Sequence, residues 1–169
     1  MGAEPASLTR RLTAGDEIAF AELYDRFGAR LFRTARRLLN DEHAAEDAVQ
    51  DVFAALARSH ANLAAVTDWT AYLFASLRHA TARIGERLVR RPESLTVDPA
   101  ASQAPSGDAS LERALAELPA EQREVLALKF EGGLTFDQIG LQLGISANTA
   151  ASRYRYALEK LRRMMEADR

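Results

Sequence analysis

The chain has 169 residues, of which 47% are apolar and 27% are charged, and its formal net charge is −2. This balance is typical of a globular protein, because disordered chains carry less apolar surface and a larger net charge. A net charge near zero excludes a protein that coats DNA by bulk electrostatic attraction, so any contact with DNA must come from local basic patches. The length suits one ordinary domain or two small ones.

The sequence contains no cysteine, which excludes disulfides and thiolate metal sites and favours a reducing cytosol. Charged residues such as Glu4, Arg10 and Asp16 interrupt the first 21 residues, so they lack the continuous apolar segment of a secretion signal. No window reaches the ~18 uncharged apolar residues of a membrane span. We therefore expect a cytoplasmic protein with no membrane insertion.

Residues 92–110 contain three of the five prolines and show no sustained apolar periodicity, as is typical of a linker. The linker divides the chain into a helical domain at 1–91 and a second one at 111–169. In the first domain, apolar residues recur at the i, i+3, i+4, i+7 spacing of amphipathic helices. The three stripes are Phe20, Leu23, Tyr24, Phe27, Leu31 and Leu38, then Ala45, Val49, Val52, Phe53 and Leu56, then Trp69, Leu73, Leu77, Ala80, Ile84 and Leu88.

Residues that favour helix ends flank the expected helices of both domains. In the first domain we expect Asp16 to cap the first striped helix, and Thr67 or Asp68 to cap the third. In the second domain we expect helices over 111–118, 120–130 and 136–143, followed by a long final helix. Thr135 and Ser146 are the expected N-caps there, and Gly144 ends the third of these helices. The final helix carries an apolar stripe of Ala150, Tyr154, Ala157, Leu158, Leu161 and Met165. No strand pattern competes, so we predict an all-α fold of two small helical domains.

Residues 135–163 combine a helix, a tight glycine-containing turn and a second helix, which is the helix-turn-helix arrangement. In such a unit the second helix enters the major groove with its N-terminal side chains against the base edges. Asparagine and arginine can bind adenine and guanine edges there. The spacing alone leaves an ordinary helical hairpin with a solvated polar face as an alternative. The candidate DNA-reading residues are Asn148, Thr149, Ala151, Ser152, Arg153, Arg155 and Tyr156.

Two charged patches lie in the first domain. A basic stripe on the third helix follows helical spacing, and either a phosphate-binding surface or a solvated charged face explains it. Its members are Arg78, Arg83, Arg87, Arg90 and Arg91. An acidic patch on the second helix consists of Glu42, Glu46, Asp47 and Asp51, with Gln50 among them. Asp47 and Asp51 repel one another one turn apart, and a basic partner surface would relieve that repulsion.

In their order along the chain, these segments resemble the signature regions of extracytoplasmic-function (ECF) sigma factors. Ala45–Phe53 (AEDAVQDVF) resembles region 2.2, Trp69 and the helix after it resemble region 2.3, and 118–163 resembles region 4. The resemblance implies a sigma factor that binds RNA polymerase core, at the beta-prime clamp helices and beta flap, and directs it to promoter DNA. Members of the family are often held inactive by an anti-sigma factor, which the sequence does not identify.

The resemblance also assigns roles to individual residues. Glu46, Asp47, Gln50 and Asp51 correspond to the polymerase-docking face. The loop 59–68 corresponds to the one that captures a flipped base of the minus-ten element, with His60 and Asn62 as candidates. Arg78 and Arg83 would hold the single strand, and Lys129 would contact the minus-thirty-five backbone. The sequence departs from the family pattern at His79 (usually Asn), Arg83 (commonly Asp), Gly140 (usually Ala) and Tyr156 (frequently Arg).

Two other classes of protein compete with this interpretation. A metalloenzyme would use His43 and Glu46 on one helix face, but His60 and His79 are the only other histidines, too few for a di-metal site. A response-regulator-like activator would carry a receiver domain of alternating strands and helices, and 1–91 has no such alternation. We therefore expect no enzymatic activity, no cofactor and no metal.

Overall fold

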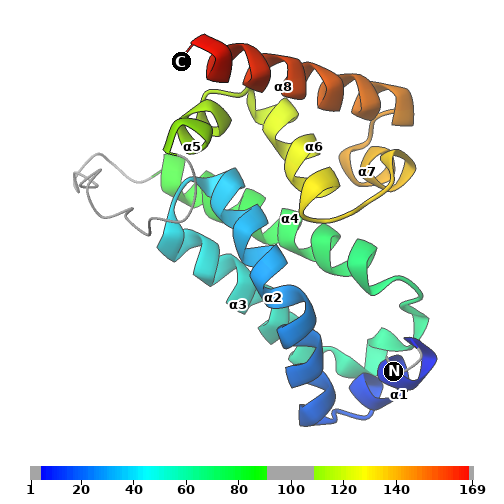
Figure 1. The fold of residues 1–169 in the computed structure, drawn as a ribbon. Helices are drawn as coiled ribbons and strands as arrows, with labels where there is room; N and C mark the ends of the chain where they lie inside the picture. The colour runs from blue at the N-terminus through cyan, green and yellow to red at the C-terminus, as the bar shows by residue number, and fades with distance from the viewer. Residues whose placement is uncertain (1–4, 91–108, 168–169) are drawn as a thin grey trace.

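A computed structural model describes residues 5–90 and 109–167 (Figure 1). Every regular element in these two ranges is helical, as the sequence predicts. The elements are α1 (Pro5–Thr13), α2 (Glu17–Leu39), α3 (Glu42–Arg58), the 3-10 helix η1 (His60–Ala65), α4 (Trp69–Val89), α5 (Ala109–Ala116), α6 (Ala120–Phe130), α7 (Phe136–Leu143) and α8 (Ala147–Ala167).

The N-terminal unit, residues 5–90, is built on the three striped helices α2, α3 and α4. Their apolar stripes meet in one core, where Phe27, Leu31 and Leu73 are fully buried. The short α1 lies against η1 at one end of this bundle (Figure 1). The apolar stripes predict that Tyr24 and Leu88 lie in the core. Both predictions are wrong, because Tyr24 is 53% exposed and Leu88 is 37% exposed. Each lies at the margin of its stripe, where a helix that packs on one side leaves side chains in contact with solvent.

Aspartates cap the three long helices of the N-terminal unit. Asp16 accepts hydrogen bonds from the backbone N–H groups of Ile18 and Ala19 at the start of α2. Asp41 caps α3, and Asp68 rather than Thr67 caps α4. These carboxylates satisfy N–H groups that have no partner within the helix. Residues close in sequence therefore fix the point at which each of these helices begins.

The C-terminal unit, residues 109–167, contains α5 to α8. Thr135 and Gln138 form the reciprocal cap of α7, and Gly144 ends that helix in the left-handed conformation with a φ of 66°. The hydroxyl of Ser146 accepts a hydrogen bond from the N–H of Thr149 at the start of α8, as expected. Helix α5 begins and ends two residues earlier than the predicted 111–118, and it packs on α8.

The predicted linker, 92–110, lies outside the described residues except for its last two positions. Ala109 and Ser110 already belong to α5, so that end of the prediction is wrong. In the final helix, Ala150, Ala157 and Leu161 are buried as expected, whereas Leu158 is 44% exposed.

The two units share a core. A single buried cluster runs from α2, α3 and α4 into α6, where it includes Val125 and Leu128. The α6–α7 turn adds Leu134 to this cluster, and α7 adds Ile139. A second, smaller cluster joins α5, α6 and α8. The C-terminal unit is therefore held against α2 and α4 by apolar contact as well as by polar groups (Figure 1).

Gly140 allows α7 to approach the start of α8. A Cβ atom at this position would lie 2.7 Å from the carbonyl oxygen of Ile145, which is backbone and cannot rotate away. At Gly85 in α4, by contrast, the nearest atom would be the Leu39 Cδ2 at 3.9 Å.

We expect Gly140→Ala to lower the free energy of unfolding by about 1 kcal/mol or more, because the overlap with backbone outweighs the gain in helix propensity. The matched control, Gly85→Ala, should raise it by up to ~1 kcal/mol, since there the helix propensity gain acts alone. Urea denaturation of both variants measures these changes. A stabilised Gly140→Ala variant would contradict the close packing of α7 on α8.

Candidate nucleic-acid and protein interface

The N-terminal half of α8 is an exposed polar surface opposite its buried stripe. Asn148, Thr149 and Arg155 are exposed, and the guanidinium of Arg155 lies 5.5 Å from the centre of the Tyr156 ring. That cation–π contact pre-orients the arginine with its donors in solvent. The predicted reading residues therefore share one face, except for Arg153.

Arg153 and Lys129 are engaged within the C-terminal unit. Arg153 forms an ion pair with Glu121 of α6, at 2.6 Å, and only 27% of its side chain is exposed. The ammonium group of Lys129 donates to the carbonyl of Leu134 at 3.0 Å and lies 4.8 Å from the centre of the Phe136 ring. Both cations stabilise the packing of α6 in this structure.

The predicted acidic face lies on α3. Glu46, Asp47 and Gln50 are exposed, and Asp51 is partly exposed. The carboxylate of Asp51 accepts a hydrogen bond from Arg83 of α4 at 2.9 Å, so the repulsion that we inferred between Asp47 and Asp51 is partly relieved within the chain. The sequence could not reveal this, because Arg83 lies on another helix.

A shallow groove between α2 and α3 adjoins this acidic face. Tyr24 lies over Gly28 on the α2 side and contacts the edge of the Phe53 ring at a centroid distance of 5.0 Å. The groove is lined by Tyr24, Gly28, Ala29, Phe32, Glu46, Val49 and Gln50. Exposed apolar and acidic groups thus lie side by side, a combination suited to a partner with basic and apolar side chains.

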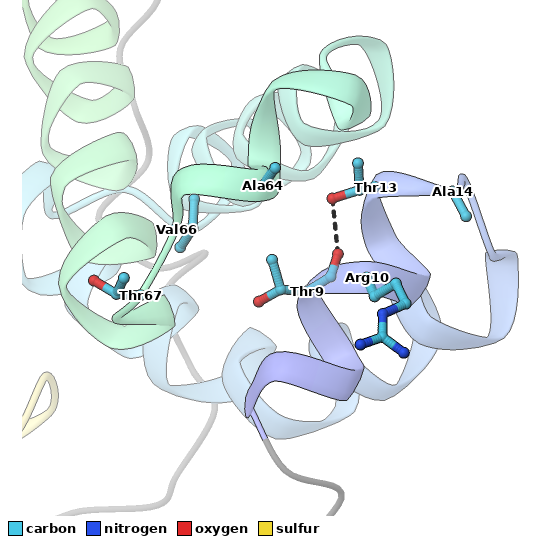
Figure 2. Close-up of a pocket in the computed structure, with 7 residues that line it drawn as sticks. All are labelled: Thr9, Arg10, Thr13, Ala14, Ala64, Val66 and Thr67. Carbon is cyan, nitrogen blue, oxygen red and sulfur yellow. Dashed lines mark hydrogen bonds between the residues drawn. The ribbon is translucent and has the colours of Figure 1, made fainter.

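The predicted base-capturing loop, 59–68, contains η1 and forms one wall of a pocket whose other wall is α1 (Figure 2). Ala64, Val66 and Thr67 lie on the loop side, opposite Thr9 and Thr13. Arg10 and Ala14 complete the lining. Apolar groups, hydroxyls and one guanidinium therefore surround a space that is open to solvent.

Two contacts fix α1 against η1 and the start of α4, and a third fixes it against the start of α2. The Trp69 indole N–H donates to the hydroxyl of Thr9 at 3.0 Å, and the His60 Nδ1 lies 2.9 Å from the carbonyl oxygen of Thr13. Arg11 binds the carboxylate of Asp16 at 2.7 Å, and this hydrogen bond lowers the pKa of Asp16. Asn62 is exposed on η1, whereas His60 is partly buried under α1. Of the two predicted base-binding residues, only Asn62 therefore presents its side chain freely.

Comparison with known proteins identifies the family. Residues 23–84 match the family described as Sigma-70 region 2, and residues 114–163 match Sigma-70, region 4. The ECF RNA polymerase sigma factor SigE of Mycolicibacterium smegmatis is 31% identical, with 94% of this chain and 67% of that protein aligned. This chain belongs to the ECF sigma factors. It is therefore an RNA polymerase sigma factor that directs promoter recognition and transcription initiation.

Further relatives of this sigma factor agree in sequence and in fold. The ECF RNA polymerase sigma factor SigK of Mycobacterium tuberculosis is 27% identical, with 95% of this chain and 92% of that protein aligned. The sigma factor RpoE of Bartonella quintana, solved with the anti-sigma factor NepR, is 26% identical and superposes with a TM-score of 0.68 over 89% of this chain and 98% of that chain. CnrH, solved with the cytosolic domain of CnrY, shares the fold at 22% identity, with a TM-score of 0.71 over 97% of this chain and 98% of that chain.

Both arginines that we assigned to the single strand lie in ion pairs of this sigma factor. Arg78 binds Glu124 of α6 at 3.0 Å, and Arg83 binds Asp51, which belongs to the predicted docking face. His79, which departs from the family pattern, lies between these two arginines in the sequence, and its side chain is exposed. The ion pair of Arg83 thus links a residue expected to bind DNA to one expected to bind polymerase.

Sequence reasoning missed two features of the sigma factor. Helix α1 was not predicted, although Leu8 and Leu12 carry the i, i+4 spacing of an apolar stripe and are both buried. A row of arginines on α2 was also missed, because the partners of three of them lie about 100 residues away in the chain, at Glu131 and Gly132. The row consists of Arg26, Arg30, Arg33 and Arg37.

Two further observations concern the described part of the chain. None of its helices is long and apolar enough to cross a membrane. Nor does any cluster of three or more His, Asp or Glu side chains within 5–90 and 109–167 form a set of metal ligands.

Proposed function

We propose that this sigma factor docks on core polymerase through the acidic face of α3, formed by Glu46, Asp47, Gln50 and Asp51. The observation that carries this proposal is the exposure of these four polar groups beside the groove that contains Tyr24 and Phe32. A partner helix with basic and apolar side chains would pair with the carboxylates and cover the groove. We place this encounter in the cytoplasm, where the polymerase acts.

We propose that the pocket between α1 and η1 receives a base flipped out of the minus-ten element. Flipping a base costs a few kcal/mol, which stacking and hydrogen bonds in the pocket must offset. Val66 and Ala64 offer apolar contact, and Thr67 offers a hydroxyl group. The hydroxyl of Thr13 already donates to the Thr9 carbonyl, and the hydroxyl of Thr9 accepts from Trp69 (Figure 2). In this assignment His60 holds α1 in place through the Thr13 carbonyl. Asn62 does not line the pocket, so any contact of its exposed side chain with DNA lies outside the pocket.

We propose that α8 reads the minus-thirty-five element through Asn148, Thr149, Ala151, Ser152, Arg155 and Tyr156. Arg155 is the leading candidate for a guanine contact, because its guanidinium is exposed and stacked. Arg153 and Lys129 remain candidates for phosphate contact only if DNA displaces Glu121 and the Leu134 carbonyl. Arg78 and Arg83 would similarly exchange their present carboxylate partners for phosphates of the single strand.

This protein acts in initiation by binding, and the chemistry of RNA synthesis belongs to the polymerase. The sigma factor RpoE of Bartonella quintana binds an anti-sigma factor, and we propose a partner of the same class for this chain.

We expect the double variant Asp47→Arg, Asp51→Arg to lose binding to bacterial core polymerase and to lose transcription from a promoter library, because it turns the docking face basic. Direct binding and run-off transcription measure the two effects. The variant Asp25→Arg, which reverses an exposed charge on α2, should retain both. In the core-binding measurement alone, Arg83→Gln controls for the partner that Asp51 loses, because Arg83 is itself a proposed DNA contact. Unchanged affinity of the double variant would refute the docking assignment.

We expect Ala64→Leu to fill the pocket and impair promoter melting while upstream DNA binding is kept. The control is Ala65→Leu, since Ala65 is also exposed on η1 but does not line the pocket. Permanganate reactivity of unpaired thymines in the minus-ten element, with core polymerase present, measures melting. Equal melting by the two variants would exclude this pocket as the base-binding site.

We expect Arg155→Ala to lose ~1–3 kcal/mol of discrimination at a single base pair of the upstream element. Arg162→Ala, an exposed arginine two turns further along α8, should leave discrimination unchanged. Competition binding of the holoenzyme to promoters that differ at one base pair provides the measurement. An equal loss on every sequence would instead identify Arg155 as a phosphate contact.

A further inference from the structure

The last turn of α1 carries two adjacent arginines that differ in their surroundings. Arg11 binds the carboxylates of Asp16 and Glu22 at 2.7 and 2.9 Å. Arg10 is exposed, and within residues 5–90 and 109–167 its side chain has neither an ion pair nor a hydrogen bond. Helix α1 itself contains no acidic residue. The chain therefore neutralises Arg11, whereas the charge of Arg10 is open to a partner.

Arg10 lines the pocket between α1 and η1 (Figure 2). Two hydroxyl groups on the same wall already have partners: that of Thr13 donates to the Thr9 carbonyl at 2.8 Å, and that of Thr9 accepts from Trp69 at 3.0 Å. Of the lining side chains, the Thr67 hydroxyl and the Arg10 guanidinium therefore remain for a ligand. Because Arg10 is exposed, its guanidinium keeps its contact with water and lies at the rim of the pocket.

The backbone position of Arg10 is fixed by its neighbours. The hydroxyl of Thr9 accepts the Trp69 hydrogen bond, and the carbonyl oxygen of Thr13 lies 2.9 Å from the Nδ1 of His60. Both threonines lie within three positions of Arg10, so the base of the arginine side chain has one place relative to η1. Binding then orders only this side chain, which costs less entropy than ordering a mobile segment of backbone.

The opposite wall of the pocket offers no comparable cation. Residues 59–68 contain neither lysine nor arginine. His60 of this segment is held under α1 by the Thr13 carbonyl, and Asp68 is acidic. Because a carboxylate repels a phosphate, we expect the phosphate of a bound nucleotide on the α1 side, next to Arg10.

A flipped nucleotide has two parts with opposite requirements. Its base loses water on entering the pocket, where Ala64 and Val66 give apolar contact. Its phosphate carries a full charge, and burial of that charge without a partner would cost more free energy than the pocket returns, so the phosphate stays at the rim. The planar guanidinium of arginine can donate two parallel hydrogen bonds to phosphate oxygens. An arginine at the rim therefore suits the phosphate better than the base.

We propose that Arg10 binds the phosphate that adjoins the flipped base, and that α1 is thereby a DNA-binding element of this sigma factor. The proposal rests on the function assigned above to the pocket between α1 and η1. The match to Sigma-70 region 2 begins at residue 23, so α1 lies outside the part of the chain that this family model covers. Arg10 adds electrostatic affinity to the pocket and holds the strand while the base enters.

The test uses holoenzyme, formed from this protein and bacterial core polymerase, and a fork-junction DNA with a single-stranded minus-ten segment. The DNA comes from a promoter selected by in vitro transcription. Arg10→Gln should reduce the slope of log affinity against log salt by about 0.7, the value for one phosphate contact on a single strand, and this corresponds to about fivefold weaker binding at 0.1 M salt. Arg10→Lys keeps the charge and should retain most of the slope. Arg26→Gln removes an exposed arginine of α2 that does not line the pocket, and it should change neither quantity.

Chemical changes to the DNA then identify the phosphate. A neutral methylphosphonate replaces one phosphate of the minus-ten strand at a time. At one phosphate, or at two adjacent ones, it should weaken wild-type binding about fivefold and should not weaken Arg10→Gln further, because both changes remove the same ion pair. Removal of the adjoining base, with its sugar and phosphate kept, should preserve the difference between wild type and Arg10→Gln.

Three results would overturn the proposal. The first is equal affinity and equal salt slope of wild type and Arg10→Gln. The second is a loss in Arg10→Gln that adds to the effect of methylphosphonate at every position, which would exclude a phosphate of this strand. The third is a difference that disappears when the adjoining base is removed, which would assign Arg10 to the base itself.

The variant Ala64→Leu separates failure of this proposal from failure of the pocket. If Ala64→Leu impairs melting while Arg10→Gln binds normally, the pocket stands and the role of Arg10 is wrong. If neither variant has an effect, both assignments are wrong. If Ala64→Leu melts normally and Arg10→Gln binds weakly, Arg10 contacts DNA away from a flipped base, which also contradicts the proposal.

Discussion

The apolar cluster that joins α2 and α4 to α6 determines how the two units are arranged. Each unit has fewer than 90 described residues, and small units bury a smaller share of their surface than large ones. Val125 and Leu128 on α6 belong to the same buried cluster as Phe74 and Leu77 on α4. Once these side chains meet, the arginines of α2 lie beside the α6–α7 turn, and their pairing with Glu131 follows.

Much of the charge on this protein is satisfied within the chain. The pairs Asp51–Arg83 and Arg78–Glu124 have partly exposed side chains, so each contributes little to stability and can be exchanged for a partner's charge at small cost. Glu131 differs, because it is buried. Removal of its arginine partners would leave an unpaired buried charge and would therefore cost more free energy than breaking an exposed pair. Binding of polymerase and DNA is thus expected to exchange the exposed pairs more easily than the buried pair of Glu131.

The pocket for the flipped base depends on contacts between distant parts of the N-terminal unit. Trp69 and His60 do not line it, yet their hydrogen bonds to Thr9 and Thr13 hold α1 at the distance that leaves the pocket open. Arg11 and Asp16 fix the other end of α1 at its junction with α2. The loop and α1 therefore act as two walls that are aligned by side chains outside the pocket.

The sequence by itself determined the helices α2 to α8, most of their caps, the helix-turn-helix and the exposed acidic face. Caps and amphipathic stripes depend on residues within a few positions of one another. It also singled out Gly140 as a departure from the family pattern, but only the structure shows that a Cβ atom there would overlap the Ile145 carbonyl. Only the tertiary structure decided that α1 forms one wall of the pocket. It also decided that Lys129 and Arg153 bind partners within the C-terminal unit, and that Arg83 forms an ion pair with Asp51. The arginine row of α2 and Glu131 lie about 100 residues apart, and no local pattern encodes such a pairing. Their contact exists because the apolar faces of α2, α4 and α6 pack together.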